Sequence, residues 1–298
     1  MYFTSINIDF TNWVTLGISY NGYVRYYNNA ILFAKIVPEN NNILFYATEN
    51  HNYSNGIYYL SGKNIVKFPT KKAHHDLIKN EENYIYLTDS IWGHQDKLLE
   101  VSKYGKIVRE LNFGPLIKDI VYKNNDQNEI KILNKIVFDN DNIHYNSSGK
   151  QIASDWFHAN SLIYNPVTDI LYVSSRHRGV LAIDYSEWKL IWWMVDDSIN
   201  TRVDVNSYTS TISYNYHFKD LPSLQPYRVQ GDAINDGPKN QHALFLLKNG
   251  NLAMFDNQGD EDVNTQGSRY VEYKIKGEHG NYTAKKYMNI EIHLYIQE

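Results

Sequence analysis

Three histidines stand at equal intervals along the chain, and the middle one lies close to an arginine and an asparagine. His74, His158 and His242 have the same separation from one to the next. A neutral imidazole can act as a nucleophile or exchange a proton near neutral pH. Arg176 offers a planar fork of donors and Asn160 adds a directional one, which suits a tetrahedral oxyanion. These residue types predict a socket for an anionic group beside a reactive imidazole.

The middle histidine lies on a predicted β-hairpin. Two apolar runs flank an Asn-Pro-Val-Thr-Asp segment, which is typical of a tight turn. Placing Tyr164 opposite Ile170 and counting outwards by twos sets His158 opposite Arg176. Asn160 then falls on the same side of the sheet, so three polar groups converge. For each residue taken alone, the alternative is a solvated strand end.

Two further hairpins carry the outer histidines. An Asn-Gly turn after the third histidine sets His242 opposite Asn257. A Glu-Glu turn after the first sets His74 opposite Asp89, with His75 one position further along. Equivalent strands of a repeated unit would present all three histidines to one channel. The remaining histidines have no such arrangement and are expected to be structural: His51, His94, His144, His217, His279 and His293.

Several ordered motifs carry a family resemblance. The stretch DWFHANSLIY, which begins at Asp155, is followed by VSSRHRGVLAIDY, and together they resemble the signature of the PAPS-independent arylsulfate sulfotransferase family. Gln241-His242 with the later Phe255-Asp256-Asn257 resembles a second element, and Ser268-Arg269 leading into VEYKI resembles a third. The resemblance departs from the family pattern at Arg178, where the family usually has glutamine.

The resemblance implies a reaction. Family members move a sulfuryl group from an aryl sulfate to a phenolic acceptor in two displacements, through a sulfurylated histidine and without the nucleotide donor PAPS. His242 occupies the Gln-His motif of the family and is the expected nucleophile. The chain has no Gly-rich loop that opens a helix and could cradle a nucleotide phosphate, which agrees with this expectation. No cofactor and no metal are expected.

The other candidate residues would act around the sulfuryl group. Arg176, His158 and Asn160 are expected to hold its oxygens, because transfer through a loose transition state depends on positioning and charge stabilisation. His74, or its neighbour His75, is the candidate for exchanging the proton of the phenol.

Four more residues are candidates for contacts with the substrate or with the catalytic groups. Asn257 and Asp89 face two of the histidines in the predicted hairpins. Trp156, and with it Trp92, either stacks on the phenol ring or packs in the core.

Composition limits the class of protein. The 298 residues are 43% hydrophobic and include 26 Tyr and 6 Trp, a β-forming composition that can bury a large core. A net charge of −4, with both signs interspersed, argues against nucleic acid as a partner. There is no cysteine, so thiol chemistry and disulfides are excluded. The expected partners are small molecules, an aryl sulfate donor and a phenolic acceptor.

Short strands separated by polar turns recur in units of roughly 40 to 50 residues, and helical periodicity is almost absent. Leu133 to Phe138, for example, is expected to be a strand of one such unit. This repetition predicts an all-β fold, a β-propeller whose blades bury each other's faces. We count about five to six units, and the family resemblance implies six blades.

Residues 1–298 are expected to form a single propeller domain, in which residues 199–235 are a loop insertion near the channel mouth. The short carboxyl end, KGEHGNYTAKKYMNIEIHLYIQE, departs from the family pattern. The amino-terminal domain of larger members is also missing. The ring is therefore expected to be either a complete six-bladed propeller or one truncated at one or both ends.

Location and two rival functions complete the expectations. The amino terminus, MYFTSINIDFTNW, does not read as a secretory signal and no run is long enough to span a membrane, whereas the resembling family is typically periplasmic. One rival is an inactive propeller that serves as a binding scaffold. The other is a metal-dependent hydrolase with His74, His158 and His242 as ligands, in which Arg176 would set a positive charge beside the cation.

Overall fold

The computed structural model describes the main chain and side chains of most of the carboxyl-terminal two thirds of the protein. The fully described residues are 19, 21–24, 56–57, 64–70, 73–90, 96–137, 156–199, 216–258 and 267–291. Only the backbone is described for residues 2–7, 13–18, 25–28, 34–39, 42–47, 58–59, 144–145, 151–152, 202–205, 210–213 and 292. Trp92 lies outside the described residues.

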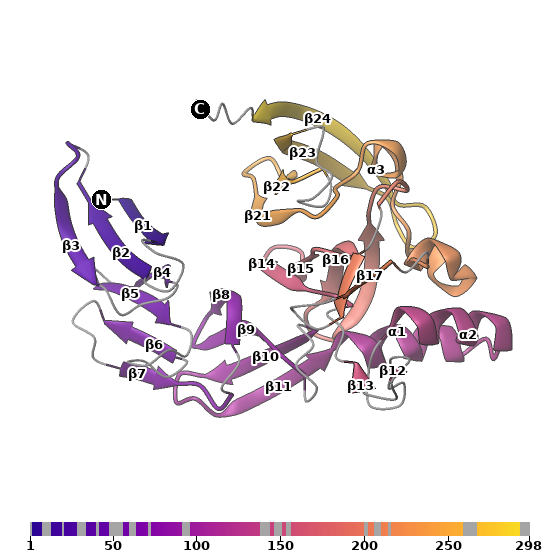
Figure 1. Ribbon diagram of the computed structural model, residues 1–298, viewed down its shortest axis with the longest axis horizontal. Coiled ribbons are helices and arrows are strands. Elements are labelled where there is room, and N and C mark those ends of the chain that lie inside the picture. The colour runs from indigo at the N-terminus through magenta and orange to yellow at the C-terminus, as the bar shows by residue number, and fades with distance from the viewer. Residues whose placement is uncertain are drawn as a thin grey trace. The chain divides into compact units, whose positions relative to one another are not determined.

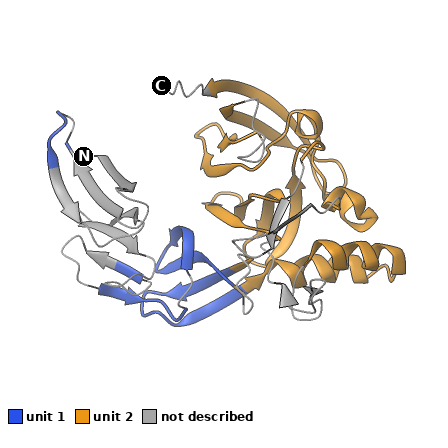
Figure 2. Cartoon of the chain, viewed as in Figure 1, with its two compact units in different colours: residues 1–89, 98–110 blue, residues 90–97, 111–298 orange. Residues whose placement is uncertain are grey.

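The chain forms two compact units (Figure 2). Unit 1 comprises residues 1–89 and 98–110, and unit 2 comprises residues 90–97 and 111–298. Among the described residues, no helix is long and apolar enough to cross a bilayer.

Unit 1 is built from β-meanders, in which strands that are neighbours in the sheet are also neighbours in the sequence (Figure 1). Its first sheet contains β1 (Tyr2–Asn7), β2 (Trp13–Ile18) and β3 (Val24–Asn28). The second contains β4 (Ala34–Glu39), β5 (Asn42–Ala47), β6 (Gly56–Tyr59) and β7 (Asn64–Lys67). The third contains β8 (Ala73–Asn80), β9 (Asn83–Thr88), β10 (Lys97–Ser102) and β11 (Ile107–Asn112). The first residue of β10 and the last two residues of β11 belong to unit 2.

Unit 2 has two larger sheets. A four-stranded meander contains β14 (Ala159–Asn165), β15 (Ile170–Ser175), β16 (Gly179–Asp184) and β17 (Lys189–Met194). A five-stranded sheet has the order β20 (Gln230–Gly231), β24 (Thr283–Ile292), β23 (Ser268–Lys276), β22 (Leu252–Asp256) and β21 (His242–Leu246). The smaller elements of the unit are α1 (Phe113–Tyr122), α2 (Gln127–Ile136), β12 (His144–Tyr145), β13 (Gln151–Ile152), β18 (Arg202–Val205), β19 (Ser210–Ser213), η1 (Phe218–Asp220), η2 (Pro222–Tyr227) and α3 (Asp232–Asn235).

The β class expected from the sequence is confirmed, since the protein is mostly strand and contains several four-stranded sheets. One local prediction is wrong, because Leu133 to Ile136 belong to helix α2 instead of a strand. The carboxylate of Asp126 caps this helix and accepts from the main-chain N–H groups of Asn128 (2.8 Å) and Glu129 (3.2 Å). Such a cap satisfies donors that have no partner within the helix, and here it outweighs the strand pattern of the apolar residues.

The two larger sheets of unit 2 share one hydrophobic core. Alternate residues along a strand point to the same face, so each sheet presents a row of apolar side chains to the other. The core combines residues of both sheets with two from the segment between them: Tyr172, Val180, Ala182, Trp192, Met194, Val229, Ala233, Leu244, Leu252, Met254, Val271, Tyr273 and Ala284. Two edge strands of the sheets, β14 and β21, lie next to each other beside this core.

A β-bulge in β14 changes the predicted hairpin register. Tyr164 pairs with Leu171 instead of Ile170. If the strands alternated regularly from this pair, His158 and Arg176 would not be opposite each other. The register then shifts at Asn160, which is the unpaired residue of the bulge. As a result the main-chain N–H of Arg176 donates to the carbonyl of His158, at 2.9 Å. The predicted juxtaposition of these two residues is therefore confirmed. It depends on the bulge, which counting by strict alternation does not include.

The other two histidine strands also have bulges. In β8 the register shifts after His74, which pairs with Leu87 instead of Asp89. In β21 it shifts after His242, which pairs with Phe255 instead of the predicted Asn257. A bulge bends its strand and redirects a side chain, and here each one lies beside a histidine singled out from the sequence.

A buried arginine anchors the segment that leads into η1. Arg178 is 2% exposed, and its guanidinium lies 5.9 Å from the ring centroids of both Trp156 and Phe218. It donates to the main-chain carbonyls of Trp156, at 3.0 Å, and Tyr216, at 3.4 Å. These contacts attach the segment at residues 216–218 to the chain just before β14.

Burial also keeps the neighbouring His217 neutral. Its Nδ1 lies 3.4 Å from Arg178, and the side chain is enclosed with the residue 5% exposed. Loss of water, together with the positive charges of Arg178 and Lys219, lowers the pKa of His217 to about 3.

A buried ion pair connects the ends of β22 and β23. Asp256 is fully buried, and one of its oxygens accepts from Nε of Arg269 at 2.9 Å. The other accepts from the main-chain N–H groups of Lys239 (2.8 Å) and Gln258 (3.2 Å). Burial raises the pKa of the Asp256 carboxyl, while Arg269 and these hydrogen bonds oppose the rise. Arg269 also contacts Asp236, so it ties α3 to the sheet.

We expect Arg269→Ala to lower the free energy of unfolding by about 3–5 kcal/mol, because it leaves the carboxylate of Asp256 buried without its cation. Urea unfolding followed by tryptophan fluorescence measures the loss. Lys189→Ala is the control, since Lys189 pairs with Glu187 at a site where its side chain is 72% exposed. Equal midpoints for the two variants would contradict the structural role of the pair.

We expect His217→Gln to flatten the dependence of stability on pH. The folded pKa is about 3 and the ordinary value is 6.5, so on acidification the unfolded chain takes up a proton first. Stability contributed by neutral His217 is therefore present above pH 6.5 and is lost as the pH falls, by up to about 1.4 kcal/mol per pH unit. Urea unfolding at pH 5 and pH 7 should show a smaller difference in the variant. Replacing the exposed His279 by Gln should change nothing, and an unaltered slope in His217→Gln refutes the assignment.

Candidate functional site

Four of the predicted residues meet where β14 and β21 begin. His158 and Arg176 are joined by the main-chain hydrogen bond of 2.9 Å, at one end of the β14–β17 sheet. Nδ2 of Asn160 donates to the carbonyl of Gln241 at 2.8 Å, and Gln241 directly precedes His242. The His158 ring also meets the ring of His177 edge to face, with centroids 5.6 Å apart. The junction therefore gathers an arginine, an asparagine and two predicted catalytic histidines in unit 2.

The turn that carries Arg176 is tightly constrained. Ser175 and Gly179 pair with each other, and the Arg176 turn, residues 176–178, lies between them. Gly179 has φ +79°, and an added Cβ would stand 2.1 Å from the carbonyl oxygen of Met194. Only glycine fits there, because the backbone is left-handed and the neighbouring strand is in contact.

The side chain of Gln241 holds this turn. It is fully buried, and Nε2 donates to the main-chain carbonyls of Ser175 (2.8 Å) and Gly179 (3.0 Å) and to Oγ of Ser174 (3.0 Å). The sequence marked Gln241 only as part of a family motif. Its structural role could not be found by counting along hairpins, because its partners belong to another sheet.

Two groups surround Nδ1 of His242. The carbonyl oxygen of Asn240 lies at 3.1 Å and Nδ2 of Asn257 at 3.2 Å. A carbonyl can only accept, whereas a carboxamide can turn to present its oxygen, so we assign the proton to Nδ1 and the hydrogen bond to Asn240. This tautomer leaves a lone pair on Nε2. Asn257 therefore contacts the predicted nucleophile through its side chain, although the two residues do not pair in the sheet.

Asn160 is held firmly at the same junction. It is 6% exposed, and one amide hydrogen is used by the carbonyl of Gln241. The orientation of the carboxamide follows from that carbonyl, which can face only the nitrogen. Among the described residues, Oδ1 of Asn160 has no hydrogen-bond partner. This oxygen is buried, so the carboxamide is held through its nitrogen alone.

The first histidine belongs to unit 1 and is described by itself. His74 Nε2 lies 3.5 Å from a carboxylate oxygen of Asp89, and both side chains are 14% exposed. The rings of His74 and His75 meet edge to face at 5.1 Å. Asp89 is thus placed to orient the imidazole of His74. That His74 acts together with His242 remains a prediction.

Trp156 is a core residue. It is 0% exposed, and its indole N–H donates to a carboxylate oxygen of Asp96 at 2.9 Å. Its ring also packs against that of Phe157, with centroids 5.1 Å apart. Of the two interpretations of this residue, core packing is the one that the structure supports, because a ring without an exposed face cannot stack on a substrate.

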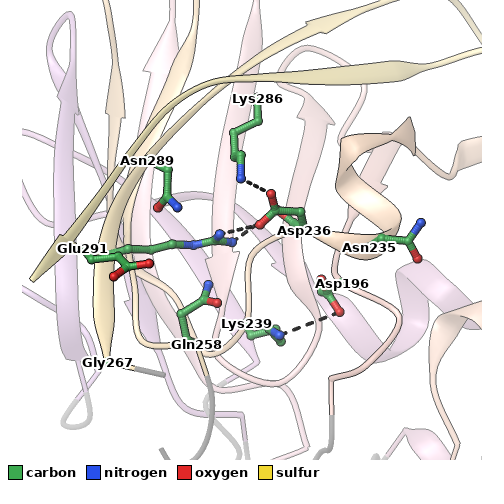
Figure 3. Close-up of a pocket in the computed structure, with 10 residues that line it drawn as sticks. Asp196, Asn235, Asp236, Lys239, Gln258, Gly267, Lys286, Asn289 and Glu291 are labelled. Atoms are coloured by element: carbon green, nitrogen blue, oxygen red, sulfur yellow. Dashed lines mark hydrogen bonds and ion pairs between the residues drawn. The ribbon is translucent and has the colours of Figure 1, made fainter. Parts of the chain in front are cut away.

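A polar cavity of about 420 Å³ lies in unit 2 (Figure 3). Most of its charged groups are paired with one another: Lys286 and Arg269 contact Asp236, and Lys239 lies 3.9 Å from Asp196. None of the predicted site residues lines it. Its walls include Lys239 and Gln258, whose main-chain N–H groups donate to Asp256. These hydrogen bonds fix the chain just before His242 and just after Asn257.

Within the ranges described above, no group of three or more His, Asp or Glu side chains is arranged so that it could hold a metal ion.

Comparisons with solved structures give weak likenesses. Hsv2 of Kluyveromyces lactis is 8% identical, with 94% of this chain and 92% of that chain covered and a TM-score of 0.34. BamB from Moraxella catarrhalis is 8% identical, with 94% and 70% covered and a TM-score of 0.34. The computationally designed Ika8 protein is 8% identical, with 95% and 81% covered and a TM-score of 0.33. Likenesses of this size carry no argument about the chain.

Comparisons of the sequence are more decisive. No curated protein matches the chain. The family model described as Arylsulfotransferase (ASST) matches residues 1–289. Because the match spans nearly the whole sequence, and includes every residue of the junction between β14 and β21, the chain belongs to the arylsulfotransferase (ASST) family.

Proposed function

We propose that the protein moves a sulfuryl group from an aryl sulfate to a phenolic acceptor through a sulfurylated His242, without PAPS. Membership of the family supports aryl sulfotransferase activity in general. The observation that carries the specific proposal is the placement of His242, whose Nδ1 faces the Asn240 carbonyl at 3.1 Å beside the junction with Asn160 and the Arg176 turn. That arrangement provides a neutral imidazole with its lone pair on Nε2, next to donors for an anion.

The first step is a displacement at sulfur. The lone pair on Nε2 of His242 attacks the sulfur of the aryl sulfate, an N–S bond forms and the S–O bond to the aryl group breaks. The electron pair of that bond leaves with the phenolate oxygen, which takes up a proton. The proton on Nδ1 stays on the imidazole, where the carbonyl of Asn240 stabilises the positive charge that develops on the ring.

Donors around the sulfuryl group stabilise its oxygens. Arg176 supplies a charged fork, His158 an imidazole N–H, and Asn160 the amide hydrogen that Gln241 does not use. Their positions are set before substrate arrives, by the buried hydrogen bonds of the turn and the bulge. Sulfuryl transfer resembles phosphoryl transfer in its loose transition state, so such fixed donors should supply most of the rate enhancement.

The second step regenerates the enzyme. An acceptor phenol gives up its proton, its oxygen attacks the sulfur, and the N–S bond breaks with return of the electron pair to His242. His74 is the candidate for delivering and removing these protons, because it shares the sequence spacing of the other two histidines and lies 3.5 Å from the carboxylate of Asp89. His75, its neighbour on β8, is the alternative.

A closed ring of blades is the architecture that goes with this proposal. The consecutive four-stranded meanders are typical of propeller blades, and the family resemblance implies six of them. By family resemblance the protein would act in the periplasm.

We expect His242→Ala to reduce transfer from 4-nitrophenyl sulfate to phenol on the order of 10⁴-fold or more, because the nucleophile is lost. Release of 4-nitrophenol measures the rate. Intact-mass analysis of the native protein with donor alone should show the gain of one SO₃ group, located on His242 by peptide mapping. His279→Ala, at an exposed histidine of the same unit, is the control and should keep the native rate. A native protein that never gains SO₃ favours the scaffold alternative.

We expect both Arg176→Ala and Arg176→Lys to lower kcat/KM for 4-nitrophenyl sulfate on the order of 100- to 1000-fold. Lysine keeps the charge but lacks the planar fork, so it should not restore the rate. Lys248→Ala removes an exposed cation from the β21–β22 turn and should have no effect. Native kinetics for Arg176→Lys would show that charge alone suffices.

A further inference from the structure

We infer that Gln241 is a positioning residue that holds the Arg176 turn against the strand of His242, an inference that rests on the proposed function. Gln241 does not need to touch the substrate to do this. Its side chain binds one sheet while its main chain belongs to the segment that leads into the other.

The carboxamide grips both sides of the turn. Nε2 lies 2.8 Å from the carbonyl oxygen of Ser175 and 3.0 Å from that of Gly179, and these two residues pair at the base of the turn. Both oxygens can only accept, so the nitrogen end of the carboxamide must face them. One side chain thus sets the distance between β21 and both strands that flank Arg176.

The main chain of Gln241 makes the reciprocal contacts. Its carbonyl accepts from Nδ2 of Asn160 at 2.8 Å and from Oγ of Ser174 at 3.2 Å. Oγ of Ser174 also accepts from Nε2 of Gln241 at 3.0 Å. The residue is therefore bonded to β14 and β15 at once, and the next residue along the chain is His242.

Because Gln241 is buried, the position of the Arg176 turn depends on these hydrogen bonds. Gln241 is 0% exposed, so water cannot replace a lost partner at the carbonyls of Ser175 and Gly179. The turn would then move to find other donors. A displacement of about 1 Å between reacting groups can cost roughly 100-fold in rate, which gives the expected size of the effect.

Gln241→Met tests this directly, because methionine has a similar length and no donor. We expect kcat for 4-nitrophenyl sulfate to fall about 10- to 100-fold. Ser223→Ala is the matched control: it removes the hydrogen bond of 2.6 Å that Oγ donates to Glu129 and the one of 2.7 Å that Oγ accepts from Asn124, in the same unit, and should keep the native kcat. Should Gln241→Met fail to fold, Gln241→Glu keeps the shape of the side chain and sets oxygens against the two carbonyls, with the same expected loss.

A double-mutant cycle separates positioning from a general loosening of the fold. If Gln241 acts through Arg176, the effect of Gln241→Met should largely vanish in an Arg176→Ala background. Loosening of the whole fold would lower kcat by the same factor in both backgrounds, and that result overturns the inference.

Amide hydrogen exchange provides a readout that does not depend on activity. Residues 174–181 should exchange faster in Gln241→Met than in the native protein, with the rest of the β14–β17 sheet unchanged. Absence of turnover in the native protein would count against the proposed function alone. The amide exchange rates of residues 174–181 would still decide whether Gln241 holds the Arg176 turn. Native exchange and native kcat in a folded Gln241→Met protein overturn the inference.

Discussion

Most polar groups buried where the two sheets meet have hydrogen-bond partners, and this requirement shapes the junction on which the site depends. The carbonyl oxygens of Ser175 and Gly179 are satisfied by the carboxamide of Gln241, which comes from a different sheet. Leaving one such group unpaired costs about 1–3 kcal/mol. The core shared by the two sheets brings the same strands together, so apolar packing and hydrogen bonding select one relative position.

The chemistry of His242 follows from what holds its other ring nitrogen. The carbonyl of Asn240 selects the tautomer with the proton on Nδ1, which places the lone pair on Nε2. Asp256 binds the main chain at Lys239 and Gln258 and is itself neutralised by Arg269. This buried ion pair fixes the chain just before His242 and just after Asn257.

Burial also decides the charge state of groups near the Arg176 turn. Arg178 keeps its guanidinium between two aromatic rings and main-chain carbonyls, and its neighbour His217 is held neutral by loss of water and by the nearby positive charges. The arginine that departs from the family pattern therefore joins the 216–218 segment to the start of β14. Gln241 holds the two ends of the Arg176 turn, and Arg178, within the turn, binds the carbonyls of Trp156 and Tyr216, so the backbone around Arg176 is fixed at several points.

The sequence by itself determined the β class, the family and the residue types of the site. Strand periodicity, turn residues and ordered motifs are local patterns, so they can be recognised from the order of residues alone. It also brought His158 to Arg176. The tertiary structure alone decided the bulges beside His74, Asn160 and His242, the burial of Trp156, and the pairing of Asp256 with Arg269. Local counting cannot find these features, because an extra residue shifts every later partner and hydrogen bonds between sheets join segments with no fixed spacing in sequence.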